Sequence, residues 1–169
     1  MAHKVEHQTV HCLVVTVSDT RTVENDKSGL LINELLEDYN HQCINHVIVP
    51  DDEEQITQLI ETAIEDERIE AVLMTGGTGI SKRDVTIEVV EQMLVKEIPG
   101  FGELFRMLSY TEDIGSTAIM SRATAGILES DKVIFAMPGS SGAVKLAMNK
   151  LILPELAHIR HELDKHLPK

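Results

Sequence analysis

The sequence is poor in the residues that bind nucleic acid. Its 169 residues include no tryptophan, two tyrosines and three phenylalanines, so few side chains are available on which a base could stack. Basic residues are also scarce, because 15 lysines and arginines stand against 28 acidic residues and the formal net charge is −13. Since neutralising a phosphate backbone requires a basic surface, nucleic acid is not expected as a partner.

Cysteines and long hydrophobic runs are few as well. Cys12 and Cys43 are the only cysteines, which is too few for a disulfide framework and favours two reduced thiols. Apolar runs such as Val133–Met137 end far short of the roughly 18 residues of a membrane-spanning helix. No secretory signal is visible at the N-terminus. We therefore expect a cytoplasmic protein without a membrane partner, formed by a single domain over residues 1–169 with residues 1–9 as a tail.

Short apolar runs alternate with segments of helical periodicity. Strands are predicted at residues 11–17, 44–49, 71–75 and 133–137, and helices from residue 27, at 56–64, 84–96 and 101–108, and from residue 142 onwards. Residues 109–131 are the least regular, with a short strand predicted at 118–120. Pro154 either kinks the terminal helix or opens a second one. This alternation predicts an α/β fold, a three-layer α/β/α sandwich around a mostly parallel sheet.

In such a fold, ligands bind beyond the carboxyl ends of the strands. Four loops follow the predicted strands, at residues 18–21, 50–52, 75–84 and 137–142. The third contains Gly76, Gly77 and Gly79, whose backbone amides could turn toward a phosphate. It fits neither the Walker nor the dinucleotide motif, so it is as compatible with a tight connection as with a site, although Lys82 and Arg83 favour an anion.

Three aspartates in these loops have two interpretations. Asp51, Asp52 and Asp84 all stand at strand ends just before predicted helices. They could cap the helices, or they could hold Mg²⁺ beside nucleotide phosphates. Periodicity alone favours capping for all three. Residues 51–70 also carry nine acidic residues against the single Arg68, a pattern typical of a solvated outer helix face.

Two histidine patterns resemble metal sites only superficially. His161 and His166 lack the four-residue spacing of a zinc-protease helix. His3, His7 and His11 repeat every fourth residue, but His11 adjoins the first strand, so nothing more than adventitious metal binding is expected.

Taken in order, the loop motifs resemble the MoaB/MogA family of molybdenum cofactor biosynthesis proteins. Two segments, Phe105–Ser109 and Phe135–Ser140, are closer to the MoaB branch. The matching motifs cover nearly the whole chain: Val17-Ser-Asp-Thr-Arg21, Val49-Pro-Asp51, Thr75-Gly-Gly-Thr-Gly79, Arg83-Asp-Val-Thr86, Pro99-Gly-Phe-Gly-Glu103, Met120-Ser-Arg122 and Met137-Pro-Gly-Ser140.

The resemblance implies a reaction as well as a fold. MogA-like members transfer AMP from Mg-ATP to the terminal phosphate of molybdopterin and release pyrophosphate. By position, Asp51 and Asp84 match the two essential carboxylates, which place Mg²⁺ and the reacting phosphate. The matching ligand-binding residues fall in two sets: Gly76, Gly77, Thr78, Gly79, Pro138, Gly139 and Ser140 for the nucleotide phosphates, and Ser18, Asp19, Ser121 and Arg122 for the pterin and its phosphate.

Other functions stay open at this point. A non-catalytic molybdopterin-binding or handover protein would use the same pocket without AMP transfer. A receiver-like phospho-acceptor built on Asp51 and Asp52 would need its acidic pair and its acceptor on different strand ends. The family also implies a homo-oligomer, a trimer or a hexamer, and contact with other enzymes of the same biosynthesis.

Overall fold

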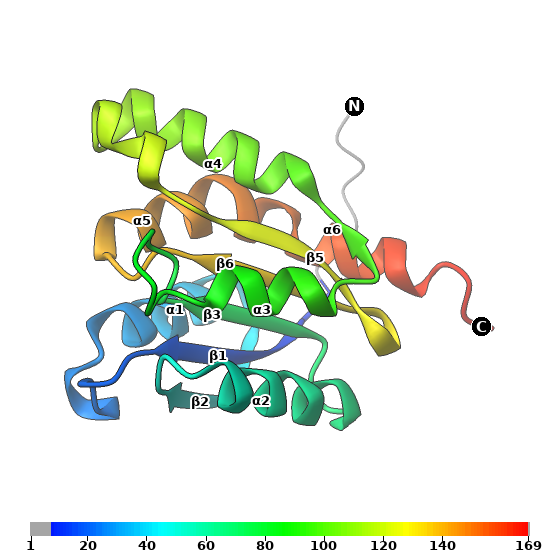
Figure 1. Ribbon diagram of the computed structural model, residues 1–169. Coiled ribbons are helices and arrows are strands. Elements are labelled where there is room, and N and C mark those ends of the chain that lie inside the picture. Colours follow the sequence, from blue (N-terminus) through cyan, green and yellow to red (C-terminus); the bar gives the residue numbers. More distant parts are fainter. Residues whose placement is uncertain (1–7, 169) are drawn as a thin grey trace.

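A computed structural model describes residues 8–168, so the first seven residues of the predicted tail lie outside the described range. Within this range the chain forms one sheet of six strands in the order β2-β1-β3-β6-β5-β4 (Figure 1). The strands are β1 (His11–Val17), β2 (Gln42–Val49), β3 (Ala71–Thr75), β4 (Lys96–Glu97), β5 (Thr124–Leu128) and β6 (Lys132–Met137). The strands β2, β1, β3 and β6 pair in parallel. Strand β5 pairs antiparallel with β6 on one side and with β4 on the other.

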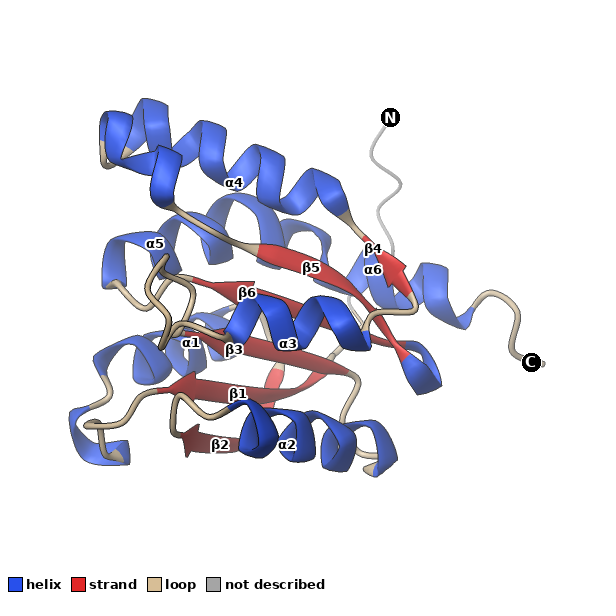
Figure 2. Ribbon diagram, in the orientation of Figure 1, coloured by secondary structure: helices blue, strands red, loops and turns tan. Residues whose placement is uncertain are grey.

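Helices cover both faces of the sheet, as Figure 2 shows. They are α1 (Lys27–Asp38), α2 (Glu53–Glu65), α3 (Thr86–Met93), α4 (Pro99–Glu112), α5 (Ser141–Ala147) and α6 (Leu153–Asp164). Two separate apolar clusters form the core. One lies between the sheet and α1, α4, α5 and α6, and the other lies under α2 and α3. The three-layer α/β/α prediction is therefore confirmed.

The central strands match the sequence prediction because their side chains are buried on both faces. Every residue of β3 and β6 is buried, as expected for parallel strands between two helical layers. The amphipathic pattern of α2 also has the predicted orientation, with Ile56, Ile60 and Ala63 buried and all four of its acidic residues exposed. Both cysteines are free thiols, as expected.

The region after α4 departs from the prediction. The strand predicted at residues 118–120 is wrong, because Gly115–Met120 form a 3₁₀ helix (η2) and the strand lies at Thr124–Leu128. This strand lacks strong β-forming residues at its centre. Gly126 stands there because a Cβ at that position would lie 2.4 Å from the carbonyl oxygen of Lys96 on β4. Because the close pairing with β4 requires glycine here, β5 lacks the hydrophobic pattern from which strands are predicted.

Three helix boundaries also differ from the prediction. Helix α3 is shorter than residues 84–96 at both ends. Helix α4 begins at Pro99, which fits the first turn because a helix start needs no backbone donor there. A π-helical turn at Met148–Ile152 follows α5, and Pro154 then stands in the first turn of α6, so the second-helix alternative is confirmed.

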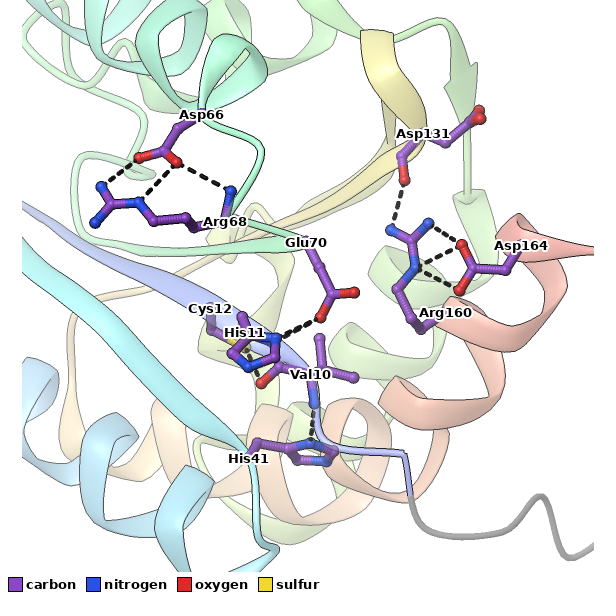
Figure 3. A network of polar contacts seen from close by, with 10 residues as sticks. All are labelled: Val10, His11, Cys12, His41, Asp66, Arg68, Glu70, Asp131, Arg160 and Asp164. Atoms are coloured by element: carbon purple, nitrogen blue, oxygen red, sulfur yellow. Dashed lines mark hydrogen bonds and ion pairs between the residues drawn. The ribbon is translucent and has the colours of Figure 1, made fainter. Parts of the chain in front are cut away.

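The edge where the parallel strands begin carries a network of paired polar groups (Figure 3). The Val10 N–H donates to His41 Nδ1 at 3.0 Å, and His11 pairs with Glu70 at 3.0 Å. Arg160, which is buried, donates to the Asp131 carbonyl and pairs with Asp164. These contacts fix the chain ends and connections at this edge. Each of these groups has a partner within the network, which indicates a structural role.

Candidate functional site

The glycine-rich loop after β3 has a backbone that only glycine adopts easily. Gly76 has φ +93° and Gly77 has φ +65°. Space is also limiting, since a Cβ on Gly76 would lie 2.4 Å from the Val17 carbonyl oxygen and one on Gly77 would lie 2.3 Å from Thr86 Oγ1. The glycines are therefore needed for the path of this loop.

Hydrogen bonds from buried threonines hold the loop in place. Thr86 Oγ1 donates to the Gly76 carbonyl at 2.9 Å, and the Thr86 N–H donates to the Gly77 carbonyl at 3.0 Å. On the other side, Thr75 Oγ1 donates to the Pro138 carbonyl at 3.0 Å, and the Gly76 N–H donates to the Met137 carbonyl at 3.1 Å. The loops after β3 and β6 thus form one unit.

Two half-buried carboxylates adjoin the glycine loop. Idealised Cβ positions show how near they are: the Cβ of Gly77 would lie 2.9 Å from Asp51 Oδ1, and that of Gly79 would lie 2.6 Å from Asp84 Oδ2. Burial, and secondarily the negative charge of Asp84, raises the pKa of Asp51 above its ordinary value. Two carboxylates that repel each other beside a loop of backbone amides are suited to sharing a cation.

The three aspartates for which sequence periodicity predicted the same capping role have different roles in the structure. Asp52 caps α2, accepting the Gln55 N–H at 2.9 Å, so the capping prediction is confirmed there. Asp84 does not cap α3, whose N-cap is Val85; it accepts instead from Ser81 Oγ at 2.7 Å and the Ser81 N–H at 3.1 Å. Asp51 makes no capping contact either, so capping is wrong for these two.

The described residues contain no group of three or more histidine, cysteine or acidic side chains that could enclose a metal ion. A pair of carboxylates is nevertheless the usual protein contribution to a Mg²⁺ ion that also binds substrate phosphates and water. Asp51 and Asp84 fit that donor set.

A cleft of about 390 Å³ opens over the glycine loop. It brings together most of the binding residues predicted from the sequence, and it adds three that were missed. From the predicted set, the lining includes Gly76, Gly77, Thr78, Gly79, Asp84, Ser121, Arg122, Pro138 and Gly139. The missed residues are Ile114, Thr117 and Met120, on or beside η2. The 3₁₀ helix η2 is too short to show a hydrophobic periodicity from which these three lining residues could have been predicted.

Arg122 closes one side of this cleft. Its Nε donates to the carbonyls of Thr78 and Gly79 at 3.1 Å each, and its Nη2 donates to the Gly79 carbonyl at 2.6 Å. Glu88 on α3 pairs with its Nη1 at 2.7 Å. The guanidinium thus holds the glycine-rich loop in place.

The residues predicted after β1 lie beside the cleft and do not line it. Ser18 Oγ accepts the N–H groups of Thr20 and Arg21, each at 3.2 Å, and so shapes its own turn. Asp19 accepts the Asp51 N–H at 3.0 Å and forms an ion pair with Arg83. Through Asp19, the ends of β1, β2 and the glycine loop are joined.

Ser140 and the loop after β6 have structural contacts as well. Ser140 Oγ caps α5 by accepting the Ala143 N–H at 3.2 Å. The neighbouring Gly139 carbonyl accepts a 2.5 Å hydrogen bond from Ser28 in the first turn of α1. Of the histidines considered above, His3 and His7 lie outside the described residues, and His166 pairs with Asp131, away from the cleft.

Comparison with known proteins identifies relatives along nearly the whole chain. The sequence profile of a family described as a probable molybdopterin binding domain matches residues 13–158. The chain is 59% identical over 156 residues to molybdenum cofactor biosynthesis protein B of Bacillus cereus, covering 92% of each chain. Its counterpart in Bacillus subtilis is 58% identical over 156 residues, covering 92% of this chain and 91% of that protein.

Solved structures agree in fold. A crystal structure of a molybdenum cofactor biosynthesis protein B superposes with a TM-score of 0.92 at 57% identity, covering 95% of this chain and 99% of that one. The tungsten cofactor synthesizing protein MoaB from Pyrococcus furiosus gives 0.83 at 38% identity, covering 94% and 99%. A MogA structure at 24% identity has a TM-score of 0.80 over 90% and 99% of the two chains, which shows a shared fold.

Proposed function

Because this chain belongs to the molybdopterin-binding domain family of molybdenum cofactor biosynthesis proteins, we propose that it is a molybdopterin adenylyltransferase. It would take AMP from Mg-ATP, pass it to the terminal phosphate of molybdopterin and release pyrophosphate. Family membership, with relatives named protein B, supports the role in the biosynthesis. The transfer reaction is inferred from the site.

The observation that carries the proposal is the pair of carboxylates, Asp51 and Asp84, that adjoin the glycine loop and repel each other. Asp51 lies against Gly77, whose φ of +65° favours glycine, and Asp84 lies where a Cβ on Gly79 would crowd it. The pKa of Asp51 is raised by burial and by Asp84. Such a pair gains from a divalent cation that also binds phosphate oxygens. A pterin carrier without nucleotide chemistry would have no need to hold two carboxylates together.

The reaction needs positioning and charge neutralisation more than a covalent nucleophile. A phosphate oxygen of molybdopterin would attack the α-phosphorus of ATP, and the bond from that phosphorus to the pyrophosphate oxygen would break. Mg²⁺ held by Asp51 and Asp84 would offset the negative charge on the phosphates. The amides of residues 77–79 and the loop Pro138–Ser140 would orient them, and Arg122 would neutralise the substrate phosphate.

Pyrophosphate release tests this proposal directly. Purified protein, Mg-ATP and molybdopterin should yield pyrophosphate and the adenylylated pterin, whereas Asp84→Asn should reduce turnover by about a thousandfold. Asp51→Asn should also lose turnover yet fold at least as stably at neutral pH, because its raised carboxyl pKa means that the charge is a folding penalty. That penalty vanishes at a pH below the ordinary carboxyl pKa.

The handover alternative makes the opposite prediction. A carrier would bind molybdopterin with the same affinity with and without Mg-ATP, and it would release no pyrophosphate. Calorimetry with and without nucleotide therefore separates the two, and molybdopterin binding without any adenylylated product would refute the transferase.

No helix among residues 8–168 has the length and hydropathy to cross a membrane. A cytoplasmic site of action is part of the proposal.

A further inference from the structure

A second cavity adjoins the cleft over the glycine loop. It lies between α3, the start of α4 and the start of β5, and has a volume of about 450 Å³. Arg122 lines both cavities, so they lie on either side of the same residue. A substrate whose phosphate lies at the glycine loop could therefore extend past Arg122 into this second space.

Two charged side chains on one face of α4 line this cavity and are unpaired. Glu103 and Arg106 stand three residues apart, which places them side by side on the helix. Neither forms a hydrogen bond or an ion pair with any residue in the described part of the chain. The Arg106 guanidinium lies over Gly102, where a Cβ would stand 3.1 Å from its Nη1. Gly102 thus leaves room for the guanidinium against the surface of the helix.

The charge of the cavity argues against a phosphate there. Glu91, Glu97 and Glu103 line it together with Arg106 and Arg122, and Arg122 already pairs with Glu88. The local balance is therefore negative. Apolar groups from Ile87, Ile98 and Pro99 complete the wall. Such a site suits a neutral flat ring that donates hydrogen bonds to a carboxylate.

We propose that this cavity binds the ring system of the pterin substrate through its 2-amino-4-oxo-pyrimidine edge, with Glu103 and Arg106 as the residues that select it; the inference rests on the proposed function. The Glu103 carboxylate accepts from the 2-amino group and the adjacent ring N–H. Arg106 donates to the 4-oxo oxygen. Guanine presents the same edge, so the experiment must separate the two ring systems.

The test is a titration of the full-length protein with pterin, followed by its own fluorescence. Lumazine, in which a carbonyl replaces the 2-amino group, and guanosine serve as the comparison ligands. Wild-type protein should bind pterin about tenfold more tightly than lumazine, because an acceptor left unpaired opposes binding. Glu103→Gln should weaken pterin binding about tenfold and remove that preference. Arg106→Met should weaken pterin and lumazine equally, since both ligands carry the 4-oxo group.

Matched controls separate ring recognition from folding and from nucleotide binding. Glu112→Gln, on the exposed far end of α4, should bind pterin as wild type does. ATP affinity should be unchanged in Glu103→Gln and in Arg106→Met. Absence of saturable pterin binding to wild-type protein, an unchanged pterin affinity in Glu103→Gln, or tighter binding of guanosine than of pterin would each overturn the assignment.

The two proposals fail in different ways. If wild-type protein releases no pyrophosphate from ATP and molybdopterin but binds pterin in a manner that depends on Glu103, the transferase proposal fails and the ring site stands. If pyrophosphate is released and the pterin titration is insensitive to Glu103 and Arg106, the ring lies elsewhere and the transferase stands.

Discussion

At the scale of single residues, Gly77 is the position where the site depends most directly on backbone geometry. Replacing it with alanine would force a side chain into φ +65° and place its Cβ 2.3 Å from Thr86 Oγ1 and 2.9 Å from Asp51 Oδ1. Strain of this kind costs about 2 kcal/mol. We expect Gly77→Ala to lower the free energy of unfolding in urea by about that amount and to abolish detectable ATP binding.

Gly100 provides the matched control for this substitution. It lies in the first turn of α4, and no atom lies within 4 Å of the place its Cβ would take. Gly100→Ala should therefore be neutral or stabilising by about 0.5 kcal/mol, with ATP affinity unchanged. Equal behaviour of the two variants would contradict the role given to the Gly77 backbone.

Residue types in the loops predicted the site better than they predicted the roles within it. The glycine cluster, Asp84 and Arg122 come together in one cleft as expected. Asp51 and Asp52, however, are adjacent in the chain and look equivalent there, while in the structure one faces Gly77 and the other caps α2. The direction of a side chain in a turn depends on tertiary contacts, here the Asp19 carboxylate that holds the Asp51 N–H.

At the scale of elements, the start of α1 connects the buried core to the loop after β6. Asp26 is fully buried and caps α1 by accepting the Gly29 N–H at 3.1 Å. Its other carboxylate oxygen bonds Thr16 of β1 and His46 of β2. Two residues on, Ser28 donates to the Gly139 carbonyl. The cluster therefore places α1 so that Ser28 can hold the loop after β6.

Asp26→Asn tests this connection. Burial alone would raise the pKa of Asp26, but hydrogen bonds from Thr16, Gly29 and His46 lower it below its ordinary value of 3.8. The charged form therefore stabilises the fold above that pH, and the contribution is lost as the pH falls through the lowered pKa. We expect a loss of about 3 kcal/mol at pH 7 in urea denaturation, and a smaller difference from wild type below pH 4.

Asp38→Asn, at the exposed end of the same helix, is the control and should change stability little at either pH. A pH-independent difference for Asp26→Asn would mean that the carboxylate charge does not matter. A stable variant with normal ATP affinity would show that α1 is placed by packing alone.

Elements with strong periodicity were predictable, and those defined by pairing were not. The stripe of α2 and the apolar runs of β3 and β6 are set by burial that the sequence records directly. The strands β4 and β5 are held by each other and by α4, so glycine and small residues suffice there. For the same reason, a weak hydrophobic pattern, the sequence did not predict η2 or the three cleft residues on or beside it.

At the scale of the whole molecule, the net charge of −13 is concentrated away from the site. Glu53, Glu54, Glu61 and Glu65 are exposed on α2, as the sequence predicted. The cleft over the glycine loop instead has Arg122 and backbone amides beside its one lining carboxylate, Asp84. An acidic protein can therefore bind anionic substrates, because local donors and a bound cation determine the potential in the cleft.

A surface formed by α4 and η2, apart from the residues that line the cleft, bears on assembly. Met107, Tyr110 and Ile119 are exposed there by 55%, 62% and 88%, on α4 and η2. Large apolar side chains gathered on one surface of an otherwise acidic protein mark a protein contact. We propose that this surface, the α4–η2 face, joins copies of the chain in the homo-oligomer expected from the family.

The α4–η2 face predicts a specific assembly defect. The variant carrying both Tyr110→Asp and Ile119→Asp should sediment as a monomer where the wild type sediments as a trimer or hexamer, because a charge in an apolar contact is costly to bury. Leu30→Asp, at an isolated exposed leucine on α1, should leave the oligomer intact. Since η2 supplies Thr117 and Met120 to the cleft, the monomer should also bind ATP more weakly, by about tenfold. A monomeric wild type, or an oligomer that survives both aspartates, would place the contact elsewhere.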